Sequence, residues 1–166
     1  NDVNDYIIKE YGNIPVSIFA TSFGAYITLI NIAKNRKEYK NVILRSPALR
    51  MGEIYINTLL REDIEEYKKR GYTILGFERE MKVPYSFMTE LENNDIFEIF
   101  EKNELPKVYI VQGDKDDIAP ISDTKEFMEK HKDKVELCII NGADHRMKGP
   151  GELEKAIEFS SKIMLR

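Results

Sequence analysis

Hydrophobic and polar residues follow two different patterns along this chain, and the two patterns alternate. Apolar residues are nearly continuous in four short runs, which is typical of strands buried on both faces of a sheet. The four runs are residues 16–20, 41–49, 107–112 and 135–140. Between them, apolar residues recur every three or four positions, which predicts helices that pack by one face. This alternation predicts an α/β fold, with a mostly parallel sheet that carries helices on both faces.

Three helices are predicted to cover this sheet. The first follows residue 22 and runs to about residue 37, and the second reaches Lys130, with Ser122 as a suitable N-cap. The third begins after Gly151. From its helical spacing we expect the third helix to turn five apolar residues inward, namely Leu153, Ala156, Ile157, Ile163 and Met164.

The middle of the chain is less regular, and we expect residues of about 50–103 to form an insertion rather than part of the sheet. A helix is predicted over residues 52–70, where Gly71 would end it. Its apolar side would consist of Ile56, Leu59, Leu60, Ile64 and Tyr67. Two short strands, in 72–77 and 81–87, and a short helix in 95–103 are predicted to follow.

The start of the chain predicts a helix rather than a free end. Val3, Tyr6 and Ile7 have helical spacing, and Gly12 would end that helix. The chain also begins without methionine. We therefore expect residues 1–166 to be the later portion of a single domain whose N-terminal part is missing from this sequence.

Composition narrows the classes of function. The 166 residues are 42% hydrophobic, which suits one domain with a sizeable core. Lys and Arg number 25 against 29 Asp and Glu, and the net charge of −4 is spread along the chain. Neither nucleic acid nor an anionic membrane surface is expected as a partner, because neither would find a basic patch.

The longest stretch without a charged residue, residues 11–33, is long enough to cross a bilayer. It contains Gly12, Pro15 and several hydroxyl and amide side chains, so a membrane span is not expected. The single cysteine, Cys138, lies in an apolar strand and is predicted to be a buried thiol. A reducing, cytoplasmic compartment is the simplest expectation.

Polar residues follow three of the predicted strands at the point where each strand ends. Ser22 comes after the first strand, a run of aspartates at 114–117 after the third, and His145 after the fourth. Because the carboxyl ends of parallel strands meet at one edge of the sheet, we expect these groups to lie together. A serine hydroxyl becomes a nucleophile when a histidine, held by a carboxylate, removes its proton.

Each residue also has an ordinary structural interpretation. Ser22 alone is more often a helix N-cap than a nucleophile, and His145 alone is more often a loop histidine with a satisfied hydrogen bond. His131 is predicted to lie at a solvated helix end. The functional hypothesis therefore depends on the three signals occurring together and in this order.

Metal and nucleotide sites are not predicted. A calcium loop starting at Asp114 would have Ala119 where glycine is needed and Lys125 where glutamate is needed. The chain has no set of His and Cys ligands for zinc, no P-loop and no G-x-G-x-x-G pattern. We expect no cofactor and no metal.

The segments ATSFGAY, GDKDDIAP and GADH, in this order, resemble the α/β-hydrolase superfamily. The resemblance is greatest to small serine esterases and to lysophospholipase-like and serine-aminopeptidase-like members, and it covers nearly the whole chain. The G-x-S-x-G elbow appears here with Ala20 in the place of the first glycine, and Gly24 in the second. Both positions are expected to be small because strand and helix approach closely beneath the serine.

The resemblance implies a role for each of several residues. Ser22 would be the nucleophile, His145 the base and Asp116 the acid, since Asp116 stands four residues before a proline. The backbone N–H of Phe23 would supply one oxyanion donor, and the second would come from an earlier strand that this sequence does not contain. The substrate pocket would be lined by Phe23, Tyr85, Phe87 and Met88, with residues 50–103 as a cap over it.

Three functional hypotheses follow. The favoured one is a serine carboxylesterase of the EC 3.1.1 type, acting on small or medium acyl esters. The second keeps the triad but assigns peptidase or amidase activity. The third is a non-catalytic hydrolase-like module, or a fragment that needs the missing N-terminal part of the fold as its partner.

Overall fold

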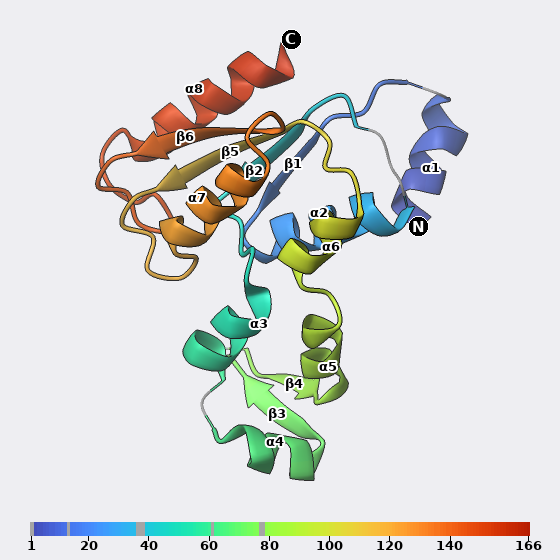
Figure 1. Cartoon of the computed structure of the whole chain (residues 1–166), viewed down its shortest axis with the longest axis vertical. Coiled ribbons are helices and arrows are strands. Elements are labelled where there is room, and N and C mark those ends of the chain that lie inside the picture. The colour runs from blue at the N-terminus through green and yellow to red at the C-terminus, as the bar shows by residue number, and fades with distance from the viewer. Residues whose placement is uncertain (1, 13, 36–38, 61, 77–78) are drawn as a thin grey trace.

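A computed structural model of the chain shows a parallel sheet of four strands with a smaller lobe attached to it (Figure 1). It describes residues 2–12, 14–35, 39–60, 62–76 and 79–166. The strands are β1 (Ile18–Thr21), β2 (Val42–Arg45), β5 (Val108–Gly113) and β6 (Val135–Ile140), hydrogen-bonded in the order β1-β2-β5-β6. All three pairings are parallel, which confirms the α/β class predicted from the sequence.

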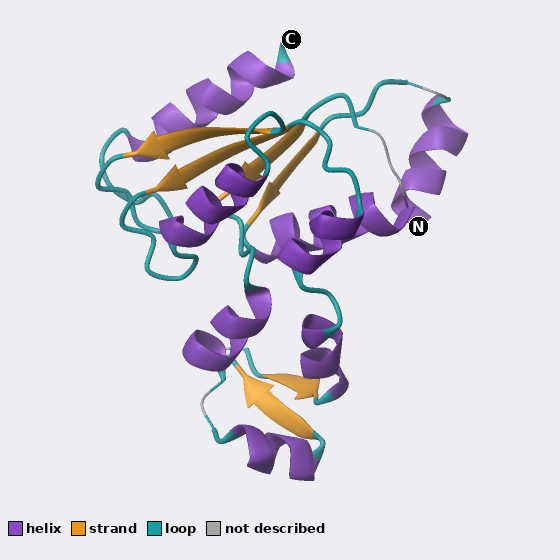
Figure 2. Cartoon of the chain, in the orientation of Figure 1, coloured by secondary structure: helices purple, strands orange, loops and turns teal. Residues whose placement is uncertain are grey.

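Helices cover both faces of this sheet (Figure 2). On one face lie α2 (Phe23–Asn35), α6 (Ile96–Lys102) and α7 (Ile121–Lys130), and on the other lies α8 (Glu152–Met164). The first helix, α1 (Asp2–Tyr11), lies to the side of the sheet. Ile110 belongs to the core under α2, α6 and α7, whereas its neighbour Val111 belongs to the core under α8. Successive strand residues point to opposite faces, so burial of both faces explains the nearly continuous apolar runs.

The small lobe, residues 51–92, consists of short elements that lie away from the sheet (Figure 1). It contains α3 (Met51–Ile54), the π-helical turn η1 (Tyr55–Leu59), α4 (Ile64–Arg70), the antiparallel strands β3 (Tyr72–Leu75) and β4 (Met81–Pro84), and α5 (Ser86–Glu92). The two predicted strands therefore form a hairpin. The predicted helix near residue 95 is α6, which packs against α2 beside the sheet.

The single helix predicted over residues 52–70 is wrong, because the chain leaves the helix after η1 and starts a new one. The Asp63 carboxylate accepts hydrogen bonds from the first backbone N–H groups of α4, which favours a helix start at that point. The break changes the burial of the segment before it. Tyr67 is fully buried, as predicted, but Ile56 and Leu59 are exposed and Tyr55 is buried in their place.

Two details of the other helices also differ from prediction. Ser122 lies inside α7, whose N-cap is Pro120. The buried residues of α8 are Ala156, Ser160 and Ile163, while three residues expected to face inward are exposed. The exposed fractions are 45% for Leu153, 56% for Ile157 and 39% for Met164.

These exposed residues of α8 line a groove against β1, at one edge of the sheet. The groove has a volume of about 600 Å³ and also includes Phe19 of β1 and Arg45 of β2. Within the part of the chain that the structure describes, β1 pairs only with β2, so the sheet ends there. The apolar stripe of α8 is therefore exposed because no strand or helix of the described chain covers that end.

Candidate active site

Ser22 occupies a sharp turn between β1 and α2. Its φ of 51° is in the left-handed region, which is strained for a residue with a side chain. The turn is held by neighbouring backbone groups: Ser22 N–H donates to the carbonyl of Arg45 at 3.0 Å, and the Ser22 carbonyl accepts from the N–H groups of Ala25 and Ala48. The strand-to-helix turn thus presents the hydroxyl at the carboxyl edge of the sheet.

The reason expected for a small residue at position 24 is not supported. A Cβ placed on Gly24 would meet no described atom within 4 Å outside its neighbours and the backbone of its own helix. The glycine that packing does require is Gly113, at the end of β5. A Cβ there would lie 2.1 Å from the carbonyl oxygen of Ala143, because the two loops that follow β5 and β6 touch at this point. Sequence reasoning missed this requirement.

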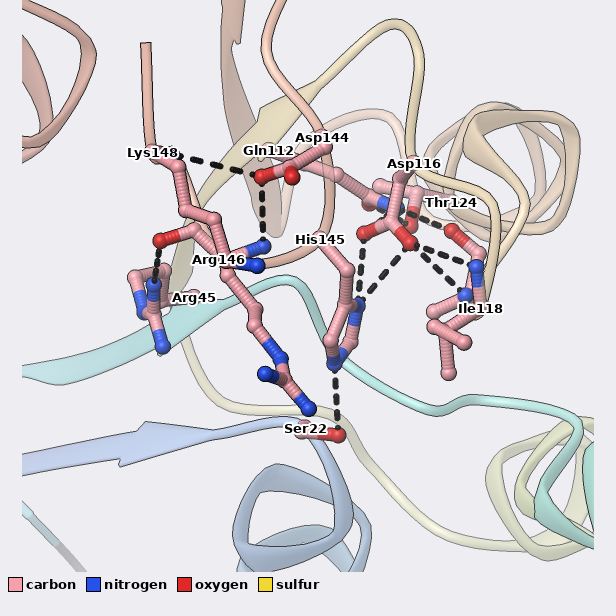
Figure 3. A network of polar contacts seen from close by, with 11 residues as sticks. Ser22, Arg45, Gln112, Asp116, Ile118, Thr124, Asp144, His145, Arg146 and Lys148 are labelled. Atoms are coloured by element: carbon pink, nitrogen blue, oxygen red, sulfur yellow. Dashed lines mark hydrogen bonds and ion pairs between the residues drawn. The ribbon is translucent and has the colours of Figure 1, made fainter. Parts of the chain in front are cut away.

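The structure brings Ser22, His145 and Asp116 together from three different loops (Figure 3). His145 Nε2 lies 2.9 Å from Ser22 Oγ, and His145 Nδ1 lies 2.9 Å from each carboxylate oxygen of Asp116. A carboxylate only accepts hydrogen bonds, so Nδ1 carries the proton and Nε2 accepts from the serine hydroxyl. This is the tautomer that a general base beside a serine needs.

Asp116 is buried and well supplied with hydrogen bonds. Its side chain has no exposed surface, and Oδ1 accepts from the backbone N–H groups of Ala119 at 2.8 Å and Ile118 at 3.1 Å. Burial alone would raise the pKa of this carboxyl, but the hydrogen bonds from His145 and from the backbone outweigh burial and leave the pKa below its ordinary value. The carboxylate is therefore ionised at neutral pH, next to the imidazole.

The other aspartates near the site differ in their hydrogen bonds and in their exposure. Asp114 Oδ1 accepts from the N–H of Gly142 at 2.6 Å, so it ties the loop after β5 to the loop after β6. Asp117 is exposed. Asp144, which sequence reasoning did not single out, accepts from the N–H groups of Arg146 and Lys148 and so shapes the loop that carries the histidine.

The residues expected to line a pocket lie at the junction of α2 and the small lobe. The ring of Phe23 stacks on Tyr26 and meets the ring of Phe87 edge-on, with centroids 6.0 Å apart. Met88 lines a cavity of about 230 Å³ between the small lobe and α2. Tyr85 packs on Tyr67, inside the small lobe, with centroids 5.0 Å apart.

Phe23 is the first residue of α2. Its N–H therefore belongs to the first helical turn, where N–H groups have no carbonyl within the helix to bond. Within the described part of the chain this N–H is free to act as the oxyanion donor expected from the sequence.

His131, expected at a solvated helix end, is half-buried against the ring of Phe127, with ring centroids 4.8 Å apart. Burial, together with the charge of Lys130, lowers the pKa of His131. Among the described residues there is no cluster of three or more His, Cys, Asp or Glu that could hold a metal, and no helix that is both long and apolar enough to span a bilayer.

Comparison with known proteins identifies the fold. No protein-family model matches the chain. It is 24% identical over 182 aligned positions to a monoglyceride lipase homolog of monkeypox virus, covering 94% of this chain and 66% of that protein. Est1E from Butyrivibrio proteoclasticus, solved with ferulic acid bound, matches with a TM-score of 0.75 and 24% identity, covering 99% of this chain and 66% of that one.

Mouse α/β-hydrolase domain-containing protein 10 matches with a TM-score of 0.65 and 20% identity, covering 98% of this chain and 66% of that one. The chain thus spans about two thirds of the length of these relatives. At this level of identity the structural likeness shows the α/β-hydrolase fold, which agrees with the resemblance carried by the sequence motifs.

Proposed function

We propose that this chain, which has the α/β-hydrolase fold, is the catalytic portion of a serine hydrolase that cleaves carboxylic esters. The observation that supports this proposal most strongly is the continuous chain of hydrogen bonds from Asp116 through His145 to Ser22. The hydroxyl in that chain of hydrogen bonds sits on a strained turn at the start of a helix. The names of similar proteins, an esterase and a monoglyceride lipase homolog, favour esters over other acyl compounds.

The proposed reaction follows from this chain of hydrogen bonds. Ser22 Oγ attacks the ester carbonyl while His145 Nε2 takes its proton, and Asp116 stabilises the imidazolium that forms. The N–H of Phe23 and the N-terminus of α2 stabilise the negative oxygen of the tetrahedral intermediate. The intermediate then expels the alcohol, which receives the proton from Nε2. Water repeats the sequence on the acyl-serine and releases the carboxylic acid.

The direct test is covalent labelling of Ser22 by a fluorophosphonate. We expect labelling of the wild-type chain and none of Ser22→Ala, with Ser122→Ala as a matched control because Ser122 is an exposed serine on α7. Ser22→Ala should keep its melting temperature, because the hydroxyl contributes little packing. Labelling that persists in Ser22→Ala would refute the assignment of the nucleophile.

Peptidase or amidase activity on the same triad is the alternative. Paired substrates with one acyl group, a p-nitrophenyl ester and the matching p-nitroanilide, separate the two. We expect turnover of the ester only. Preferred turnover of the anilide would favour the peptidase or amidase, and labelling without turnover of either would favour a non-catalytic module or an incomplete enzyme.

The small lobe is proposed to act as a cap within the same domain, as part of the insertion at about 50–103. Its aromatic rings form a continuous series with the elbow, since Phe23 contacts Phe87 and Phe87 contacts Tyr55 at 5.2 Å. The acyl group would then lie near Phe23, Phe87 and Met88, with Tyr85 behind them. Replacement of Phe87 by alanine tests this placement, because it removes apolar contact with the acyl group.

The groove along α8 and the free edge of β1 are proposed to be covered by the remaining third of a complete hydrolase fold. Similar proteins are longer by that amount, and the groove offers apolar side chains beside a strand edge that no described strand pairs with. That part would also supply the second oxyanion donor, whose absence typically lowers turnover by about 10²–10³-fold.

The groove proposal is tested on the 166-residue chain. Uncovered apolar surface should bind the dye ANS, and Ile157→Lys should reduce binding more than Ile74→Lys, a control at an exposed site of the small lobe. Equal effects would contradict the proposal.

We also propose a cytoplasmic location, supported by the single half-buried cysteine, Cys138. Recovery of the protein in a secreted or periplasmic fraction would contradict that location.

A further inference from the structure

Two polar side chains lie fully buried behind Asp116. Gln112 is in β5 and Thr124 is in α7, and neither has exposed surface. The residues before Gln112 in the strand, Ile110 and Val111, are apolar and equally buried. Burying an amide among such residues is costly unless each of its polar atoms finds a partner. A glutamine at this position is therefore a feature that packing alone does not explain.

The hydrogen bonds of Gln112 fix the orientation of its amide. One side of the amide faces the Ala119 carbonyl at 2.6 Å and Asp116 Oδ2 at 3.3 Å, and both of these groups can only accept. The Nε2 group must therefore lie on that side, with one N–H directed at each acceptor. The Oε1 atom on the other side accepts from the Thr124 hydroxyl at 2.6 Å. Thr124 thus holds the amide in the orientation that serves Asp116 (Figure 3).

This arrangement closes a loop around the carboxylate. Gln112 Nε2 donates to the residues at both ends of the segment from Asp116 to Ala119, while Asp116 Oδ1 accepts from the N–H groups of Ile118 and Ala119. The carboxylate cannot rotate without losing a donor on each oxygen. Its two oxygens are in this way kept equally close, at 2.9 Å, to His145 Nδ1.

We propose that Gln112 and Thr124 are positioning residues that hold the Asp116 carboxylate against His145, an inference that rests on the proposed function. The donor from Gln112 also draws charge from Oδ2, so it moderates how strongly the carboxylate stabilises a protonated imidazole. Loss of the donor has two consequences. The charge on the Asp116 carboxylate is less shared with other donors, and Asp116, His145 and Ser22 become less well aligned.

The test uses Gln112→Met, which keeps the length of the side chain but removes both N–H donors. The first readout is the pH midpoint of His145 followed by NMR, which is practical because the chain has two histidines and His131 serves as the internal reference. The second readout is the rate of Ser22 labelling by a fluorophosphonate. We expect the His145 midpoint to change and labelling to slow by about 10–100-fold, the range known for loss of the outer partner of a metal-binding histidine.

Other charged groups near the imidazole stay unchanged in these variants. Asp116 is the group in contact with it, Asp144 and Arg146 belong to its own loop, and Arg45 reaches that loop from β2, where its guanidinium donates to the Arg146 carbonyl. A moved midpoint therefore reports the hydrogen bond between Gln112 and Asp116.

Variants of Thr124 keep the test decisive if Gln112→Met does not fold. Thr124→Val should change both readouts in the same direction by less, and Thr124→Ser should restore them because it keeps the hydroxyl. Thr73→Val, at a buried threonine of the small lobe, is the matched control and should lower the melting temperature without moving the His145 midpoint.

The outcomes separate this inference from the proposed function. A wild-type chain that is not labelled at Ser22 contradicts the proposed function, and the His145 midpoint then still tests the hydrogen bond. A labelled wild type whose Gln112 and Thr124 variants keep both the midpoint and the labelling rate contradicts the positioning role alone. A lower melting temperature with both readouts unchanged makes the pair purely structural.

Discussion

Replacement of Asp116 by asparagine is the change whose effect the structure specifies most completely. Two backbone N–H groups, of Ile118 and Ala119, point at Oδ1. In Asp116→Asn the amide oxygen will take that position, because an NH₂ group there would face two donors. The amide nitrogen is then placed where Oδ2 was, 2.9 Å from His145 Nδ1, and the hydrogen bond that Gln112 Nε2 donates to Oδ2 is lost.

The consequence for the imidazole is a change of tautomer. An NH₂ group donates to Nδ1, so the ring proton moves to Nε2, which must then donate to Ser22 Oγ instead of accepting from it. In this state His145 cannot remove the serine proton. We expect turnover and labelling to fall by about 10⁴-fold, the size of the effect when a triad imidazole is held in the wrong tautomer. The fold should persist, since the shape of the side chain is kept.

The assay is the second-order rate of fluorophosphonate labelling at pH 7, with the pre-steady-state burst of a p-nitrophenyl ester as a second measure. Circular dichroism checks the fold. Asp117→Asn is the matched control, because Asp117 is adjacent and exposed, and it should leave both rates almost unchanged. Asp114→Asn should mainly lower stability, since it weakens the link to Gly142. The reasoning is refuted if Asp114→Asn shows the large catalytic loss and Asp116→Asn does not.

Three further predictions concern stability and binding. Gly113→Ala should lower the free energy of unfolding in urea by more than about 1–3 kcal/mol, because its Cβ would overlap the Ala143 carbonyl. Gly24→Ala is the control and should be neutral or stabilising. Equal effects of the two substitutions would contradict the close approach of the two loops. Because the pKa of Asp116 is lowered in the folded state, its contribution to stability is present above the unfolded pKa of about 4 and is lost as the pH falls through the folded pKa. Urea unfolding of the wild type should therefore lose more stability than Asp116→Asn between pH 7 and pH 3, and parallel losses would show that the carboxylate is not stabilised by its partners. Phe87→Ala should raise KM for esters with bulky acyl groups by about tenfold with little change in kcat, through loss of apolar contact, and an unchanged KM would remove Phe87 from the pocket.

The prediction of the sheet succeeded because strands buried on both faces have a strong signature. Each of the four apolar runs contains a strand of the sheet, and the polar residues that follow three of them meet at one edge. The rule that parallel strands end together was enough to place Ser22, His145 and an aspartate near one another. The resemblance to the α/β-hydrolases selected Asp116 among three neighbouring aspartates, since Asp116 stands four residues before a proline.

The predictions that failed depended on contacts between distant segments. The pattern at α8 indicates which residues are apolar, but whether Leu153 and Ile157 are covered depends on what lies beyond β1, and the described chain has nothing there. The prediction of one helix over residues 52–70 failed because the Asp63 carboxylate starts a second helix, and Ile56 and Leu59 before the break are exposed.

The sequence by itself therefore determined the class of fold, the edge of the sheet where the chemistry would lie and the three residues to inspect, because strand periodicity and strand ends are local properties. Only the tertiary structure decided the rest. The orientation of the imidazole, the need for glycine at Gly113, and the support of Asp116 by Gln112 and Thr124 all depend on close contacts between groups of different segments. Such contacts form at about 3 Å, the distance of a hydrogen bond. The packing of the elements sets these distances, and a local pattern of residues does not determine that packing.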